Sequence, residues 1–109
     1  MSVVPRLPIH PEAEMELMEA ARYLGRAREG YDLLLLEEYE HVAERAARLP
    51  KSGTAVAGFH ERHDVRRFSL QRFRYHVVTA IVSGERIAIA FAHMKRRPGY
   101  WADRLKQAQ

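Results

Sequence analysis

The side chains best suited to chemistry gather near the C-terminal end of the sequence. The stretch "HMKRRPGYWADRL", residues 93–105, brings His93, Arg97 and Tyr100 close together along the chain. Histidine and tyrosine can transfer protons, and arginine can stabilise negative charge on a phosphate. With Arg66 as a further cation, these are the residue types that cleavage of RNA requires. Sequence spacing does not show that they meet in space, so a nuclease site and a set of structural residues both remain open.

Arginines also dominate the second half of the chain. Residues 1–50 contain six Lys and Arg against ten Asp and Glu, whereas residues 51–109 contain twelve against four. Guanidinium groups form paired hydrogen bonds with phosphates and carboxylates, so this half favours an anionic partner. The alternative is a solvated basic surface. The arginines expected to form a binding surface are Arg66, Arg67, Arg72, Arg74, Arg96 and Arg97.

Trp101 directly follows the densest basic cluster, and we expect it to be a structural anchor. If "YWADRLK" forms a helical turn, Trp101 and Leu105 share one face, and Tyr100 and Arg104 share the next. Large aromatic side chains stabilise a core more often than they stack on nucleobases. A buried Trp101 would hold the preceding arginines at a fixed edge of the protein.

The sequence indicates neither a metal nor a cofactor. The stretch "HERHD" places His60, His63 and Asp64 where they could touch one ion, but no second pair of ligands accompanies them. The chain has no cysteine, which excludes thiol catalysis and cysteine-bound zinc. It also has no glycine-rich phosphate loop and no H-E-x-x-H motif. We therefore expect no metal and no cofactor.

Two amphipathic helices are expected to come first among the elements that position these residues. In "HPEAEMELMEAARYL", apolar residues recur at helical spacing, and Pro11 suits the first turn. A second apolar stripe runs through "YDLLLLEEYEHVAERAARLP", where Pro50 stops the helix. The connection between the helices is short, which predicts an antiparallel hairpin.

The rest of the chain has the alternation of β-strands. We expect strands at residues 65–70, 74–82 and 86–94, with the second apolar on both faces and therefore central. Strict alternation in the last strand would put Ile87, Ile89 and Phe91 on one face. Residues 51–64 are expected to form a loop, and residues 3–9 could add an edge strand. The prediction is a single α+β domain, residues 1–109, with an N-terminal helical hairpin packed on a twisted antiparallel sheet of three to four strands and a short C-terminal helical turn.

The chain also lacks the apolar segments that direct proteins to membranes. No stretch has the apolar length of a membrane span, and the N-terminus reaches Glu12 without the hydrophobic block of a signal peptide. We therefore expect no membrane association and a cytoplasmic location.

The order of elements and three stretches resemble the RelE/ParE superfamily of bacterial toxins, particularly its ParE-like plasmid-stabilisation branch. The stretches are "HPEAEMELMEAARYL", "VRRFSLQRFRYHVV" and, as the most specific of them, "AHMKRRPGYWADRL". The resemblance implies the toxin of a type II toxin–antitoxin system, neutralised by a cognate antitoxin in a possible toxin–antitoxin hetero-oligomer. Arg66 and Arg97 lie in the matching stretches and rank first as binding residues.

The resemblance leaves three functions open. ParE-like members are associated with inhibition of bacterial DNA gyrase, and RelE-like members with cleavage of mRNA on the ribosome. The third is a non-toxic basic module that binds nucleic acid or has a regulatory role, because fold does not fix function. The sequence has no compelling acid–base pair, so we expect gyrase inhibition by binding. If the protein is instead an endoribonuclease, His93, Arg97, Tyr100 and Arg66 are its candidate catalytic residues.

Overall fold

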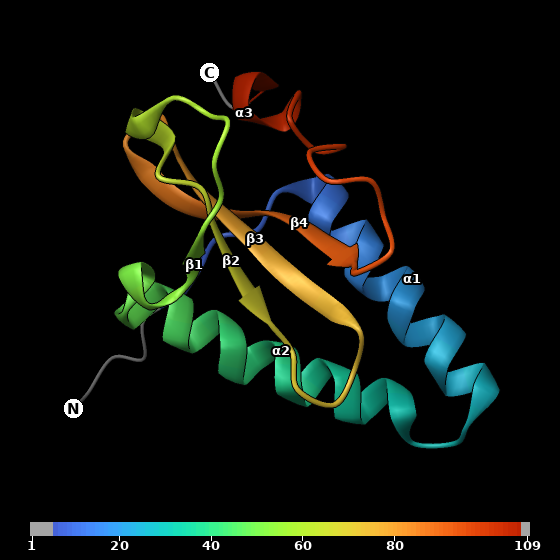
Figure 1. Ribbon diagram of the computed structural model, residues 1–109. Coiled ribbons are helices and arrows are strands. Elements are labelled where there is room, and N and C mark those ends of the chain that lie inside the picture. The colour runs from blue at the N-terminus through green and yellow to red at the C-terminus, as the bar shows by residue number, and fades with distance from the viewer. Residues whose placement is uncertain (1–5, 108–109) are drawn as a thin grey trace.

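The computed structural model describes residues 6–107 and begins with an antiparallel pair of helices, α1 (Pro11–Ala27) and α2 (Tyr31–Arg48) (Figure 1). His10 caps α1, because its Nδ1 accepts a hydrogen bond from the backbone N–H of Glu12 at 3.1 Å. Gly30 joins the helices with a φ of 85°, in the left-handed region that favours glycine. The predicted helical hairpin is confirmed. In the described part of the chain, no helix is long and apolar enough to cross a membrane.

A four-stranded antiparallel sheet follows, in the order β1-β2-β3-β4. The strands are β1 (Thr54–Ala55), β2 (Arg66–Ser69), β3 (Tyr75–Val82) and β4 (Glu85–His93), and a short helix α3 (Arg104–Gln107) ends the described chain. The predicted central strand is β3. The segment expected to be a loop instead contains β1 and two 3-10 turns, η1 (Pro50–Ser52) and η2 (Glu61–His63). The α+β fold class is confirmed.

The two faces of the sheet bury different sets of side chains. The helices cover one face, where Leu17, Leu35 and Tyr39 pack with Val77 and Phe91. The C-terminal segment covers the other face, where Trp101 and Leu105 pack with residues of β3 and β4. In Figure 1 this segment lies at the end of the molecule away from α2, beside the loop that precedes β2. The sheet is therefore the middle layer, and each core depends on which way its strand residues point.

A β-bulge in β4 changes that direction. Val78 pairs with Ala90 but the next residue of β3, Thr79, pairs with Ala88, so Ile89 is an extra residue. Ile89 and Ala90 therefore both contribute to the core on the helix-free face, whereas Phe91 packs against the helices. The prediction that Ile87, Ile89 and Phe91 share one face is wrong, because a bulge breaks the alternation that it assumed.

The expected N-terminal edge strand is present only as a bridge. Ile9 forms an isolated parallel bridge with Ala88; the backbone N–H of His10 donates to the Ala88 carbonyl and the N–H of Ala88 donates to the Pro8 carbonyl, both at 2.8 Å. Residues 3–5 of the expected strand lie outside the described residues. An isolated bridge in place of a full strand is consistent with the prolines of this segment, because proline has no backbone N–H to donate to a neighbouring strand.

Candidate anion-binding groove

Strand register places Arg67 and His76 on the helix-free face of the sheet. Arg67 of β2 pairs with Val78, and His76 of β3 pairs with Ala92. Directly opposed residues in an antiparallel pair project to the same face. Because Val78 belongs to the core on the helix-free face, Arg67 projects away from the helices. His76 lies two residues from Val78 along β3, so it projects the same way.

These residues meet the C-terminal segment around a small cavity of about 110 Å³. Its apolar wall includes Val56, Val78, Ala92 and Trp101, its basic side chains are Arg67, His76, Arg96 and Arg97, and Tyr100 also lines it. We call these four basic residues and the cavity between them the basic groove. The groove thus combines cations from β2 and from the segment after β4 with an apolar floor.

Trp101 fixes the position of that segment. Gly99 adopts a φ of 79°, which allows the chain to turn back after Arg97 and Pro98. The indole is only 4% exposed and stacks on Phe59 with ring centroids 5.0 Å apart. Leu105 is also buried in this core. The side chains expected to anchor the segment are therefore both inside the protein, and the effect of Trp101 on stability stays a prediction.

A second contact set ties the segment to α1 through Glu16. Its carboxylate accepts hydrogen bonds from the Tyr100 hydroxyl at 2.7 Å, from both terminal nitrogens of Arg104 at 2.9 and 3.0 Å, and from the backbone N–H of Phe91 at 3.0 Å. Burial raises the pKa of Glu16, but these donors outweigh it and the net pKa is lowered. Burial and the adjacent carboxylate raise the pKa of Tyr100. Tyr100 therefore keeps its proton and donates a hydrogen bond to the ionised Glu16.

The cations of the basic groove have no intramolecular counterion among residues 6–107. The ion pairs within residues 6–107 all use lysines or arginines outside the basic groove, and none contains Arg67, Arg96 or Arg97. The Arg96 guanidinium lies over the Tyr100 ring, 3.9 Å from its centroid, so an aromatic face orients it. Burial, followed by the charges of Arg67 and His93, lowers the pKa of His76. At neutral pH the groove thus offers three guanidinium groups and a neutral imidazole.

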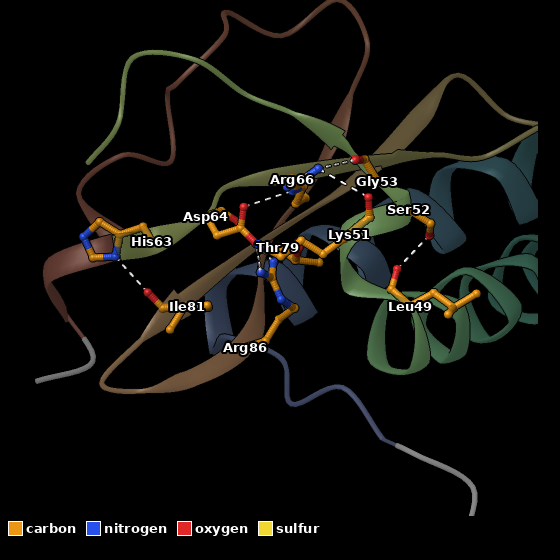
Figure 2. Close-up of polar contacts among 10 residues, drawn as sticks. All are labelled: Leu49, Lys51, Ser52, Gly53, His63, Asp64, Arg66, Thr79, Ile81 and Arg86. Carbon is orange, nitrogen blue, oxygen red and sulfur yellow. Dashed lines mark hydrogen bonds and ion pairs between the residues drawn. The ribbon is translucent and has the colours of Figure 1, made fainter. Parts of the chain in front are cut away.

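Arg66 belongs to a different site, although it is adjacent to Arg67 in sequence. Its Nε donates to Asp64 at 3.0 Å, and its Nη1 donates to the carbonyls of Lys51 and Gly53 (Figure 2). Arg86 also pairs with Asp64 and donates to the Thr79 hydroxyl at 2.8 Å. Burial raises the pKa of Asp64, but the cations outweigh it and the net pKa is lowered. Arg66 therefore holds the loop before β2 against the sheet.

Arg72 and Arg74 lie in the connection between β2 and β3, and both are exposed. The backbone N–H of Arg72 donates to Glu38 of α2 at 3.2 Å, and the Arg74 carbonyl accepts from Met94 at 2.9 Å. Neither residue lines the basic groove. Of the six arginines expected to form one surface, the structure gathers Arg67, Arg96 and Arg97.

Of the four residues named for a nuclease, Arg97 and Tyr100 line the cavity of the basic groove, but His93 and Arg66 do not. His93 lies against Tyr75, with ring centroids 5.0 Å apart, beside Glu16 and Tyr23 of α1. Its Nδ1 accepts a hydrogen bond from the backbone N–H of Lys95 at 3.0 Å. Arg97 lies in the basic groove, Arg66 pairs with Asp64, and the Tyr100 hydroxyl points to Glu16. The predicted proton-transfer groups are thus engaged in other contacts.

The three possible metal ligands of "HERHD" also have separate partners. His60 accepts from the backbone N–H of Arg62 at 3.0 Å, and the Nδ1 of His63 lies 2.8 Å from the Ile81 carbonyl. Asp64 is occupied by cations. Among residues 6–107, no group of three or more His, Cys, Asp or Glu could hold a metal ion.

His76 is the groove residue that sequence reasoning missed. The strand pattern gave a usable signal, because alternation alone puts His76 on the face of Val78 and away from Val77. It did not show which of those faces the helices leave open. That information comes from the pairing of β2 with β3 and from the position of Trp101.

Neither the protein-family models nor the curated proteins contain a match to this chain. The resemblance to RelE/ParE toxins therefore stays a prediction based on the three stretches quoted above.

Proposed function

We propose that this protein is the toxin of a type II toxin–antitoxin system, and that it acts in the bacterial cytoplasm by binding DNA gyrase. The basic groove is the surface that would contact the target. The observation that carries the proposal is the set of three guanidinium groups, Arg67, Arg96 and Arg97, without a carboxylate partner among residues 6–107. Such groups bind phosphates or acidic side chains, since their own charge is not neutralised within the chain.

Binding is preferred over catalysis because of what the proton-transfer candidates contact. Tyr100 donates to a carboxylate whose pKa is lowered, so it is poorly placed to act as an acid toward RNA. His93 uses its Nδ1 to accept a backbone hydrogen bond and packs on Tyr75. A complementary surface needs neither group to be free. The cognate antitoxin would neutralise the toxin by covering the basic groove with acidic side chains.

One observation favours a second candidate, the RelE-like endoribonuclease. His76 lies in the groove beside the arginines. Its lowered pKa favours the neutral imidazole, which can accept a proton, while the guanidinium groups carry the positive charge. A ribose 2′-hydroxyl held in the groove would be its substrate. If this candidate is right, His76→Ala lowers the rate of mRNA cleavage on the ribosome about a hundredfold to ten-thousandfold, whereas His93→Ala has little effect on that rate.

Expression in bacteria tests the proposal directly. Wild-type protein should arrest growth, and coexpression with the antitoxin should restore it. Arg97→Glu should relieve the arrest, whereas Arg72→Glu, an exposed charge reversal outside the groove, should not. Normal growth at high levels of soluble wild-type protein would contradict toxicity and favour the non-toxic module. Equal effects of both variants would remove the groove from the proposal.

A further inference from the structure

His76 lines the basic groove with both of its ring nitrogens unpaired. Among residues 6–107, no hydrogen bond or ion pair involves the imidazole. In that part of the chain, no buried nitrogen or oxygen of a side chain lacks a partner, so the unpaired nitrogens of the half-buried His76 contact solvent. The imidazole is therefore open to a ligand that enters the cavity.

The charged groups around His76 are basic. Strand β2 contributes Arg67, and the segment after β4 contributes Arg96 and Arg97. His93, at the end of β4, is close enough for its charge to act on the imidazole. Burial, followed by the charges of Arg67 and His93, lowers the pKa of His76 from its ordinary value of 6.5. A proton on His76 is therefore disfavoured by its surroundings.

The remaining neighbours do not supply a counterion. No Asp or Glu is among the described residues that line the cavity. Tyr100 directs its hydroxyl to Glu16, whose carboxylate is paired with Arg104. On β3 itself, Arg74 lies two residues before His76, but it is another cation and does not line the cavity. A negative charge near the imidazole has to come from a ligand.

An anion in the groove would reverse this balance. It would lie among three guanidinium groups, which form charge-assisted hydrogen bonds with oxyanions, and its charge would act on the imidazole beside them. A nearby negative charge favours the protonated form of a histidine. By linkage, the protonated histidine strengthens binding of the anion by the same factor.

We propose that the basic groove binds an anion and a proton together, with the anion among Arg67, Arg96 and Arg97 and the proton on His76. The groove then has three cations at neutral pH without a ligand, and gains a fourth when the anion binds at lower pH. The inference rests on the proposed function only in taking the groove as the surface that meets an anionic partner. Binding of that partner becomes tighter as pH falls.

The size of the cavity limits the anion to one group at a time. Its volume of about 110 Å³ is below the range of about 300 to 1,000 Å³ for pockets that enclose whole small-molecule ligands. A single oxyanion group fits this description. Sulfate is a suitable probe, because its own charge is constant between about pH 5.5 and 8, so that any pH dependence of binding comes from the protein.

The direction of the pH dependence follows from the two protonation states. Above about pH 7.5, His76 is neutral with or without the anion, so the affinity is constant. As pH falls further, the anion-bound protein takes up the proton first, and the affinity rises. Sulfate should bind about tenfold more tightly at about pH 5.5 than at about pH 7.5, which is the effect of one moderately coupled proton.

Nuclear magnetic resonance of the isotope-labelled full chain tests both sides of this linkage. The ring C–H signals of His76 report its protonation, and titration with sulfate at each pH gives the affinity. The pKa of His76 should be higher in about 50 mM sodium sulfate than in about 150 mM sodium chloride, which has the same ionic strength and the same screening. An equal pKa in the two salts would overturn the proposal.

Three single variants assign the effect to one residue. His76→Gln should bind sulfate with the same affinity at both pH values, because glutamine does not titrate. His93→Gln should keep the pH dependence, since His93 lies outside the cavity. His41→Gln, an exposed position on α2 away from the groove, should match wild type in affinity and in pH dependence. A pH dependence that survives His76→Gln or disappears in His93→Gln would overturn the assignment.

Two outcomes separate this inference from the proposed function. Wild-type protein that binds sulfate equally at both pH values would overturn the coupling and leave the groove as an anion site. Wild-type protein that binds sulfate at neither pH would overturn the coupling and the anion site together.

Discussion

Glu16 and Arg104 are 88 positions apart in sequence, yet two hydrogen bonds of 2.9 and 3.0 Å join their side chains. The pair connects the first helix to the segment that carries Arg96, Arg97 and Trp101. Both side chains are mostly buried, with 17% and 11% exposed, and the Nη1 of Arg104 also donates to the Ile89 carbonyl at 2.9 Å. The fold therefore fixes the basic groove from two sides, through this pair and through the Trp101 core.

Glu16→Ala should destabilise the protein by about 3 kcal/mol, because it removes the carboxylate that the half-buried Tyr100 hydroxyl and the mostly buried Arg104 guanidinium share, and leaves Arg104 with Glu12 and the Ile89 carbonyl alone. Urea denaturation followed by circular dichroism would measure the loss. Glu19→Ala, an exposed acid on the same helix, is the matched control and should change stability by less than about 0.5 kcal/mol. Equal effects of the two variants would show that the Glu16 network contributes little.

Stability should fall in acid because of Glu16 and Asp64. Both have a pKa below their ordinary values of 4.5 and 3.8 in the folded protein, despite burial that raises it. A lowered folded-state pKa stabilises the protein above the unfolded-state value, and that stability is lost as pH falls through the folded-state value. The free energy of unfolding should therefore decrease from about pH 5 downward. Glu16→Gln should show a shallower decrease, and a slope identical to wild type would contradict the assignment.

Asp64→Ala should cost about 3 kcal/mol, since Arg66 and Arg86 lose the carboxylate that they share. Lys51→Ala provides the comparison, because Lys51 pairs with the same carboxylate but its side chain is 76% exposed. An exposed pair contributes about 1 kcal/mol or less. Thermal unfolding of both variants would separate the two contributions, and a larger loss for Lys51→Ala would contradict the cluster as described.

Trp101→Ala should destabilise the protein by about 3 to 5 kcal/mol, because it empties a core position next to Phe59. Trp101→Phe keeps a stacked ring and should lose less. Chemical denaturation of both variants is the measurement. Unchanged stability together with lost growth arrest would instead assign the indole to a target contact.

The sequence predicted the elements well because their patterns are local. Helical spacing identified the hairpin, and the four-residue spacing in "YWADRLK" correctly separated the buried Trp101 and Leu105 from Tyr100 and Arg104, which both reach Glu16. The site depended on information that is not local. Arg66 and Arg67 are neighbours that project to opposite faces, and only the strand pairing and the position of the helices show which one reaches the groove.

The bulge at Ile89 shows the same limit within one strand. Alternation predicts the faces of β4 only while each residue has its own partner, and the extra residue reverses the pattern beyond Ile89. Nothing in the alternating apolar run "RIAIAFAH" marks that point, since every residue from Ile87 to Ala92 is apolar. The partner strand and the two cores determine it.

Inhibition of gyrase supercoiling by purified protein tests the central claim most directly, with Arg97→Glu and Arg72→Glu measured beside wild type. We predict that wild type inhibits the reaction, that Arg97→Glu raises the half-inhibitory concentration about tenfold or more, a loss of about 1.4 kcal/mol, and that Arg72→Glu leaves it unchanged. Full supercoiling in the presence of folded, growth-arresting wild-type protein would contradict the claim, as would equal inhibition by Arg97→Glu.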